Sequence, residues 1–378
     1  MRTSKYFSDN IILVFSVCVV LSFLCQIFKY PAPVNILYII SLMLVLFCYA
    51  LDGYYNGITV AMAIFIGLAS IANGFRSGEM DYYTHILITI CIFICIDVSS
   101  DVKISLDTFK KIATMFLITS IILLVAYYFG PLKSTHLEYS DAVTLNMNNP
   151  NTAGLWLTCI FILLMYSSFL FTKFKRILYI AVAIGILPIV LATQSRNSFF
   201  ACVFFVVGVI LTKFFKIKRV PKWILVALAV LPLIAFVFYM YVVVKNMDFW
   251  GKIFSTDVID KGLGTRQNVW QSVIDNFRHC FFFGDYYKYY DSQQHNSLLT
   301  IFCRFGAPVM VLACVSIYKS LKNLQTKSSF YAMLSLASIF FTGCFEASIF
   351  VGIAGMYLML LLLPACASVE SIGITKNN

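Results

Sequence analysis

The sequence predicts an all-α, polytopic integral membrane protein that forms a single membrane domain over residues 1–378. Composition is the first reason, because 61% of the residues are apolar and 12% are charged, whereas soluble globular chains carry roughly a quarter charged residues. The second reason is the length of the apolar runs, since a helix needs about 20 mostly apolar residues to cross a bilayer. The sequence lacks the alternating strand patterns of about ten residues that build an outer-membrane barrel.

Apolar runs of this length predict about twelve transmembrane helices. They cover residues 11–28, 34–51, 57–74, 83–98, 112–130, 152–171, 177–193, 197–215, 223–244, 297–318, 329–345 and 348–367. We expect the first run to be retained as a span, because the segment "FLCQIFK" at its end lacks the small-residue cleavage site of a signal peptide.

The placement of Lys and Arg explains most of the net charge of +11. With both termini in the cytoplasm, the inner connections include "VKISLDTFKK", "TKFKR", "KFFKIKRVPK" and "KSLKNLQTK". Cytoplasmic loops are enriched in Lys and Arg, so the basic excess calls for no nucleic-acid partner. The enrichment of cytoplasmic loops in Lys and Arg does not explain the arginines that the same topology assigns to the outer face.

The twelve cysteines lie nearly all inside the apolar runs, without a CxxC pair and without the Cys/His spacing of a zinc site. Cys91 and Cys95 lie one helical turn apart, which is more often ordinary membrane packing than a ligand pair. We therefore expect no disulfide framework, no metal site and no cofactor.

Two predicted outer segments are long, residues 131–151 and residues 245–296. The second is the longest polar interruption and lies between the ninth and tenth predicted helices, and a long loop with its own helix is more often functional than idle. Its tyrosine-rich part, "DYYKYYD" (residues 285–291), is typical of an interfacial aromatic belt. Stacking of these rings on sugars is the alternative.

Within the second loop, "GLGTRQNVWQSVIDNFRH" predicts an amphipathic helix at about residues 266–279 that lies along the membrane surface. Thr265 is the expected N-cap. Apolar residues then recur at helical spacing, namely Val269, Trp270, Val273, Ile274 and Phe277. Arg266 falls in the first turn, where a guanidinium beside free backbone N–H groups can hold a phosphate. The alternative is a packing helix whose arginine only extends to the surface.

Arg196, in "LATQSRNSFFA", occupies a very short outer turn among polar neighbours. A charge at this position needs a partner, so the turn predicts an outward anion site, with a helix-capping arginine as the alternative.

Arg304, in "IFCRFGAP", lies about two turns inside the predicted helix 297–318. Intramembrane arginines usually face a cavity or a partner, which here is either the substrate or Glu346.

His295 opens the helix that contains Arg304, within "DSQQHNSLLTIFCRFGAP". A neutral imidazole can accept a proton near neutral pH, although a single histidine at a loop–helix junction is often only an interfacial residue. One topology places His295, Arg196 and Arg266 on the outer face. Two cations and one base suit a reaction on a pyrophosphate-linked substrate, because the cations stabilise the charge that grows on the leaving group.

These stretches resemble the O-antigen polymerase/ligase superfamily of bacterial inner-membrane proteins, which are polytopic and carry one large periplasmic loop in the C-terminal half. The resemblance rests on motifs within residues 140–310 that occur in the family's order: Asn149-Pro150-Asn151, Thr193-Gln194-Ser195-Arg196, Arg266 with Trp270, and His295-Asn296 with Gly306 downstream. The loop is shorter than in many ligases, and the first five predicted helices add no diagnostic motif.

The resemblance implies metal-independent glycosyl transfer at the periplasmic face, from a glycan on undecaprenyl pyrophosphate and with inversion at the anomeric carbon. By position, Arg196 and Arg266 would bind the diphosphate and His295 would act as the base. Arg304 would be a third phosphate ligand or a buried support. The expected supporting residues are Asn296, Asn149, Asn151 and Glu346. Expected partners are the lipid bilayer and a chain-length regulator and a flippase of the same pathway.

The leading hypothesis is an O-antigen polymerase, or a polymerase of a related surface polysaccharide, in the bacterial inner membrane with both termini cytoplasmic. An O-antigen ligase, which transfers the glycan to lipid A–core, shares the donor chemistry and differs in the acceptor. A flippase or exporter of lipid-linked oligosaccharide would also have outward cations, but alternating access predicts charges deep at mid-membrane. A purely structural membrane subunit would leave the grouping of Arg and His unexplained.

Overall fold

The computed structural model describes residues 8–52, 56–77, 83–99, 103–130, 132, 142–147, 149–243, 264–286, 288–289, 295–327, 329–347, 349–350 and 368–370. The α-helices are α1 (Asp9–Ile27), α2 (Pro31–Asp52), α3 (Gly57–Ser77), α4 (Tyr83–Ser99), α5 (Leu106–Phe129), α6 (Pro150–Ser168), α7 (Lys173–Ala192), α8 (Arg196–Phe214), α9 (Lys222–Ala229), α10 (Leu231–Phe238), α13 (Gly264–Asp275), α14 (Phe277–Cys280), α15 (Ser297–Phe305), α16 (Ala307–Lys327) and α17 (Phe330–Thr342). A π-helical turn, η1 (Tyr239–Val243), extends α10. The short strands β1 (Lys103–Ser105) and β2 (Ser368–Glu370) pair in parallel, with Lys103 opposite Ser368.

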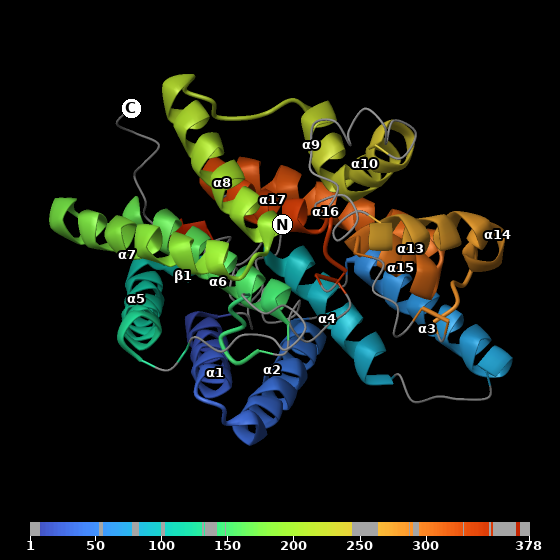
Figure 1. Cartoon of the computed structure of the whole chain (residues 1–378), viewed down its shortest axis with the longest axis horizontal. Coiled ribbons are helices and arrows are strands. Elements are labelled where there is room, and N and C mark those ends of the chain that lie inside the picture. Colours follow the sequence, from blue (N-terminus) through green and yellow to red (C-terminus); the bar gives the residue numbers. More distant parts are fainter. Residues whose placement is uncertain are drawn as a thin grey trace.

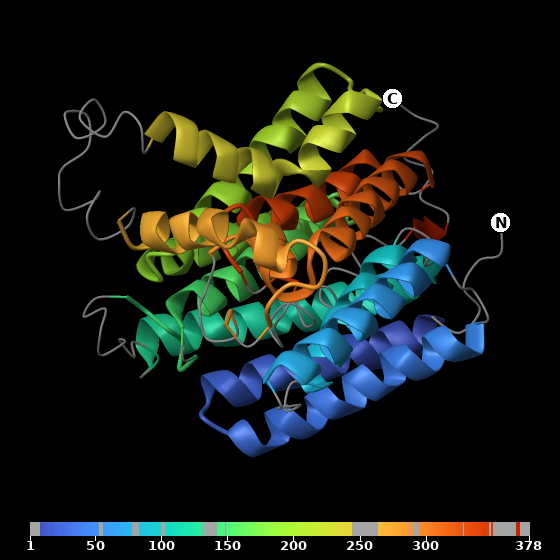
Figure 2. The ribbon, with the colours of Figure 1, turned by 90° about the vertical axis from the view of Figure 1, so that its right-hand side faces the viewer.

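The protein is a helical membrane protein. Within the described residues, seven helices are long and apolar enough to cross a bilayer, or up to eight if α9 and α10 form one bent span. The seven are α1, α2, α3, α5, α6, α7 and α8. Figure 2 shows the long helices running side by side, with α1 and α2 (blue) on one side of the bundle and α8 to α10 (yellow-green) on the other.

Two of the runs expected to be continuous spans are broken. The run 223–244 bends by 67° between α9 and α10, where Pro232 removes a backbone donor and its ring opposes the carbonyl four residues earlier. The run 297–318 is divided at Gly306, which has a φ of 88° and separates α15 from α16. The last predicted run, 348–367, lies almost entirely outside the described residues.

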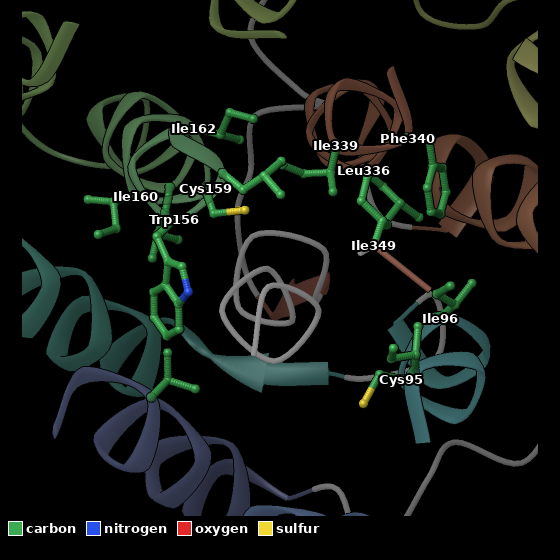
Figure 3. Close-up of a cluster of buried hydrophobic side chains, with 14 of the residues drawn as sticks. Cys95, Ile96, Trp156, Cys159, Ile160, Ile162, Leu336, Ile339, Phe340 and Ile349 are labelled. Carbon is green, nitrogen blue, oxygen red and sulfur yellow. The ribbon is translucent and has the colours of Figure 1, made fainter. Parts of the chain in front are cut away.

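Helix α6 forms the centre of the bundle. It is 83% buried inside the protein, whereas the other six long spans are 33–50% buried. Around it pack α5, α7, α8 and α17 (Figure 1). Figure 3 shows Trp156, Cys159 and Ile162 of α6 in the same apolar cluster as Leu336 and Ile339 of α17. Because α6 is enclosed by other helices, its first turn is held firmly and can position neighbouring loops.

A second apolar cluster attaches α13 to the bundle. Trp270 is fully buried, with its ring edge-on to Phe236 and Tyr239 at centroid distances of 5.4 and 4.8 Å and stacked on Phe345 at 6.5 Å. Val273 is buried beside it. In the region of the helix predicted at about 266–279, the structure has α13 followed by α14, and the apolar face of α13 packs on α10, η1 and Phe345. Thr265 lies inside α13 and is not its N-cap.

The two ends of the bundle differ in charge. At one end, called the basic end, lie the starts of α1, α5 and α7 and the ends of α6, α8 and α16. The contacts Ser105–Asp9, Arg176–Ser168 and Val220–Gln325 hold these helix ends together. Most described Lys and Arg residues lie there: Lys110, Lys111, Lys173, Lys175, Arg176, Lys213, Lys216, Lys218, Arg219, Lys222, Lys319 and Lys322. The opposite end, called the site end, carries Lys29, Arg76, Arg196, Arg278 and Lys288.

Candidate functional site

The short outer turn predicted around Arg196 is present at the site end. Helix α7 ends at Ala192 and α8 begins at Arg196, so three residues connect the two helices. Gln194 adopts a φ of 56°, and the Thr193 hydroxyl donates to the carbonyl of Val190 across 2.7 Å. Arg196 is exposed as the first residue of α8. Beside it is a small cavity of about 150 Å³, lined by Leu191, Gln194, Ser195, Arg196, Phe199 and Phe200.

Helix α6 anchors this turn from below. Ser195 and Ser198 share a hydrogen bond of 2.7 Å between their hydroxyls, and Thr158 of α6 donates to the carbonyl of Ser198 across 3.1 Å. A Cβ atom on Gly154 would lie 2.6 Å from the Ser195 Cβ and 2.7 Å from the Ser198 Oγ. Small residues on both helices therefore allow their backbones to approach closely, and this contact fixes the orientation of Arg196.

Asn149 and Asn151 act at the start of the same helix. The Asn149 side chain caps α6 by accepting a hydrogen bond from the Asn151 backbone N–H across 2.8 Å, and Pro150 occupies the first helical position. The nearby Val143 N–H donates to the carbonyl of Ala192 across 2.9 Å. The motif Asn149-Pro150-Asn151 thus shapes the site end next to the Arg196 turn.

Asn296 joins three separate parts of the chain. Its side chain is fully buried and donates to the carbonyls of Pro232 and Cys344 across 2.7 and 3.1 Å. Its side-chain oxygen accepts from the Leu299 N–H across 3.1 Å and so caps α15. Both ends of the amide are used in these bonds, so Asn296 is a structural residue that fixes the entry to α15.

His295 precedes this junction and is half-buried. Its φ of 48° is in the left-handed region, which costs energy for a residue other than glycine. Two residues on, Ser297 donates from its backbone N–H to the Gly343 carbonyl across 2.9 Å and from its hydroxyl to the Glu346 carbonyl. The hydrogen bonds of Asn296 and Ser297 therefore fix the backbone that directly follows His295.

Arg304 occupies the other end of α15, about 10 Å along the helix from Ser297. It is buried, and its guanidinium carbon lies 5.5 Å from the centroid of the Tyr286 ring. This cation–π contact stabilises a charge in an apolar setting. Glu346 is also buried and meets the start of α15 through its backbone carbonyl. Of the tyrosines expected at an aromatic belt, the two that the structure describes, Tyr286 and Tyr289, are buried.

Two glycines allow the loop before α15 to pack against its end. Gly284 has a φ of 67°, and a Cβ there would overlap the backbone of Arg304. A Cβ on Gly306 would overlap the backbone of Phe282. Backbone bonds from Asp285 to Cys303 (2.6 Å) and from Ala307 to Phe281 (2.7 Å) close this contact. The loop and the break between α15 and α16 thus form one rigid unit.

Residues of α3, which the sequence did not single out, hold this unit in place. The Asn73 amide donates to the carbonyl of Phe283 and accepts from the Tyr286 N–H, each across 3.0 Å. Arg76 donates to the carbonyl of Gly284 across 3.1 Å. The sequence held one indication of this contact, the polar residues Asn73 and Arg76 near the end of an apolar run. A buried polar side chain usually has a specific hydrogen-bond partner.

His279 forms a polar contact on the surface of the loop. Its Nε2 lies 3.0 Å from a carboxylate oxygen of Asp285. Burial raises the pKa of the neighbouring Cys280 thiol, and the Asp285 carboxylate raises this pKa further. The thiol is therefore protonated near neutral pH and is a poor nucleophile.

Helix α17 lies between the Arg196 turn and the His295 junction. Phe341 of α17 stacks on Phe204 of α8 with ring centroids 5.4 Å apart, while Gly343 contacts Ser297. Phe204 is about 12 Å along α8 from Arg196. His295 is not among the residues that line the cavity beside Arg196. These contacts place the Ser297 junction at the level of Phe204, about two turns along α8 from Arg196.

Arg266 lies in the first turn of α13. Its side chain falls outside the described part of the protein, so its predicted role stays a prediction. Within the residues whose positions are described, no group of three or more His, Cys, Asp or Glu side chains could hold a metal ion. The described site therefore offers cations, hydroxyls and one imidazole as its chemical groups.

No protein-family model matches the chain, and neither a curated protein nor a solved structure matches it.

Proposed function

We propose that this protein is a glycosyltransferase that extends a surface polysaccharide, transferring a glycan from undecaprenyl pyrophosphate to a lipid-linked repeat unit. The observations that carry the proposal are an exposed Arg196 on a turn braced by α6 and a half-buried His295 at the junction that opens α15. A cation and a nearby base are what a transfer with a diphosphate leaving group requires.

The proposed topology places the basic end in the cytoplasm of a bacterial cell and the site end in the periplasm. The distribution of Lys and Arg between the two ends supports this orientation. In this topology about twelve segments cross the inner membrane, both termini are cytoplasmic, and residues 245–296 form the periplasmic loop between the ninth and tenth spans. The interruptions at Val230 and Gly306 then lie within spans, where helix breaks line cavities or binding sites.

In this mechanism the lipid tail stays in the bilayer while the diphosphate meets Arg196 and Arg266. The exposed position of Arg196, beside serine and threonine hydroxyls, allows its guanidinium to take a phosphate in a bidentate pair. As the bond between the sugar and the diphosphate breaks, the arginines stabilise the charge that accumulates on the leaving oxygen. Displacement from the opposite face inverts the anomeric carbon.

His295 is the proposed base for the acceptor hydroxyl. Its left-handed backbone directly precedes the Asn296 cap, and this attachment limits the directions in which the imidazole can point. Arg304 is the buried support: its charge, stacked on Tyr286, raises the positive potential at the end of α15. No metal takes part in the proposed reaction.

Deletion of the gene tests the reaction class in the cell. We expect the lipopolysaccharide of the deletion strain to carry core capped by a single repeat unit, because repeat units are no longer joined. Complementation with Arg278→Ala should restore long chains, since Arg278 is an exposed arginine of α14, and complementation with Arg196→Ala should not. A bare core with accumulated lipid-linked polymer would instead identify a ligase, and unchanged chain length would refute both.

A further inference from the structure

A groove on the side of the bundle has the features of a lipid-binding site. It lies between α1 and α5, which run side by side (Figure 1), and it has a volume of about 640 Å³. Both helices start at the basic end, because Asp9 of α1 accepts hydrogen bonds from Ser105 and Thr108 of α5. The groove therefore begins at the basic end and runs toward the middle of the bundle.

The walls of this groove are apolar and open to the bilayer. Val17 and Leu21 of α1 are 37% and 44% exposed, and Ile118 and Ile122 of α5 are 54% and 40% exposed. Thr114 and Thr119, which also line it, donate their hydroxyls to carbonyls of α5 itself. The hydroxyl protons of these threonines are thus already used within α5, and the exposed side chains of the walls are apolar and fit a hydrocarbon chain.

Two lysines close the groove at its basic end. Lys110 and Lys111 both line it and are exposed. Lys111 forms an ion pair of 2.8 Å with Asp107, and 63% of its side chain is still accessible. Lys110 forms no ion pair among the described residues. An apolar groove with cations at the membrane interface complements a lipid that has an anionic head group.

The length of the groove agrees with such a ligand. From Lys110 to Ile122 the helix rises about 18 Å, close to half of the bilayer's hydrocarbon thickness of about 30 Å. One acyl chain of one leaflet therefore covers the same depth. Two N–H groups at the start of α5 are already used, because that of Ser105 donates to Asp9 and that of Thr108 donates to the Ser105 hydroxyl. The head group would thus meet the two lysines.

We propose that the α1–α5 groove binds one anionic glycerophospholipid from the leaflet at the basic end, with an acyl chain along Val17, Leu21, Ile118 and Ile122 and the phosphate at Lys110 and Lys111. The phospholipid is separate from the proposed polyprenyl substrate, whose diphosphate would lie at the site end. This inference therefore stands independently of the proposed function.

Native mass spectrometry of the full-length protein in detergent, titrated with phosphatidylglycerol or phosphatidylcholine, tests the proposal. We expect the wild type to retain one phosphatidylglycerol and to bind phosphatidylcholine more weakly. Lys110→Gln with Lys111→Gln should lower the phosphatidylglycerol affinity about tenfold. The matched control, Lys218→Gln with Lys222→Gln, removes two exposed charges at the same end and should keep the affinity.

A second variant separates the groove from general surface charge. Ile118→Trp fills the apolar part and leaves both lysines in place, so it should also lose the bound lipid. Intact folding of each variant is checked by monodisperse elution and an unchanged melting temperature in detergent. Equal binding of the two phospholipids, an equal loss in the control, or full binding by Ile118→Trp would overturn the proposal. So would retention of a polyprenyl phosphate in preference to phosphatidylglycerol.

Discussion

The side-chain amide of Asn296 donates to the backbone carbonyl of Pro232, 64 positions earlier in the chain, across 2.7 Å. Pro232 marks the sharp bend between α9 and α10, and Asn296 marks the start of α15. A second bond from the same amide reaches Cys344, after the end of α17. The residue next to the proposed base thus joins three segments: the bend at Pro232, the start of α15 and the chain that follows α17.

Replacement of Asn296 tests this structural role. Asn296→Ala leaves the carbonyls of Pro232 and Cys344 buried without these donors, so we expect a loss of stability of about 2 kcal/mol or more. Thermal unfolding of the purified protein in detergent measures it. Gln271→Ala, which removes an exposed side-chain hydrogen bond on α13, is the control and should change the melting temperature little. Equal melting temperatures for both variants would contradict the role of Asn296.

Glycine substitutions test the contact between the loop and the end of α15. Gly306→Ala forces a side chain onto a backbone with a φ of 88° and into Phe282, so we expect it to destabilise the protein by at least about 1–2 kcal/mol. Gly67→Ala, inside α3 with nothing within 4 Å of the added Cβ, should be neutral or stabilising by up to about 1 kcal/mol. The comparison uses the same assay. Similar effects of the two substitutions would show that the close contact is absent.

The raised pKa of Cys280 predicts a pH dependence of thiol labelling. Burial and the Asp285 carboxylate raise this pKa above its usual value of 9.0, so at any pH below the raised value the folded protein holds less thiolate than the unfolded chain. We expect alkylation of Cys280 at pH 8 to be much slower in the folded protein and to increase as the pH rises above 9. Peptide mass spectrometry after timed alkylation measures the rates. Equal rates in the folded and unfolded protein at pH 8 would contradict the prediction.

The hydrogen bonds from Asn73 and Arg76 of α3 to the loop before α15 are called the α3 clamp. The clamp gives a prediction that separates a positioning role from a stabilising one. Asn73→Asp keeps the acceptor for the Tyr286 N–H but removes the donor to Phe283, which should loosen the loop that leads to α15. We expect faster hydrogen exchange at residues 281–286 and slower glycan transfer. Asn73→Gln keeps both groups on a longer side chain and should be closer to wild type. An Asn73→Asp protein with wild-type exchange in this segment would rule out the clamp.

The helices could be predicted because their signals are local. The apolar runs mark the long helices, and the polar residues "TQSR" between two such runs mark the Arg196 turn. The breaks at Val230 and Gly306 were hidden within apolar sequence, although Leu231-Pro232 and Gly306-Ala307-Pro308 carried the signal, since proline favours the first turn of a new helix. Composition is a weak guide to breaks of this kind.

The partners of the site residues could not be predicted in the same way. Asn296 bonds to residues 64 and 48 positions away, and Asn73 bonds to residues more than 200 positions away. Such pairs depend on how the helices pack, which periodicity does not encode. The burial of Tyr286 and Tyr289 arises in the same way, because the loop folds back onto α3, α13 and α15.

Glycan extension by the purified enzyme tests the central claim most directly. Full-length protein in lipid nanodiscs is given the undecaprenyl-pyrophosphate repeat unit, and product length is read on a gel together with the release of undecaprenyl pyrophosphate. We expect the wild type and Arg278→Ala to form long chains. Arg196→Ala and His295→Ala should each lower the rate at least about a hundredfold while keeping the wild-type melting temperature. Long chains from folded Arg196→Ala and His295→Ala proteins would contradict the account.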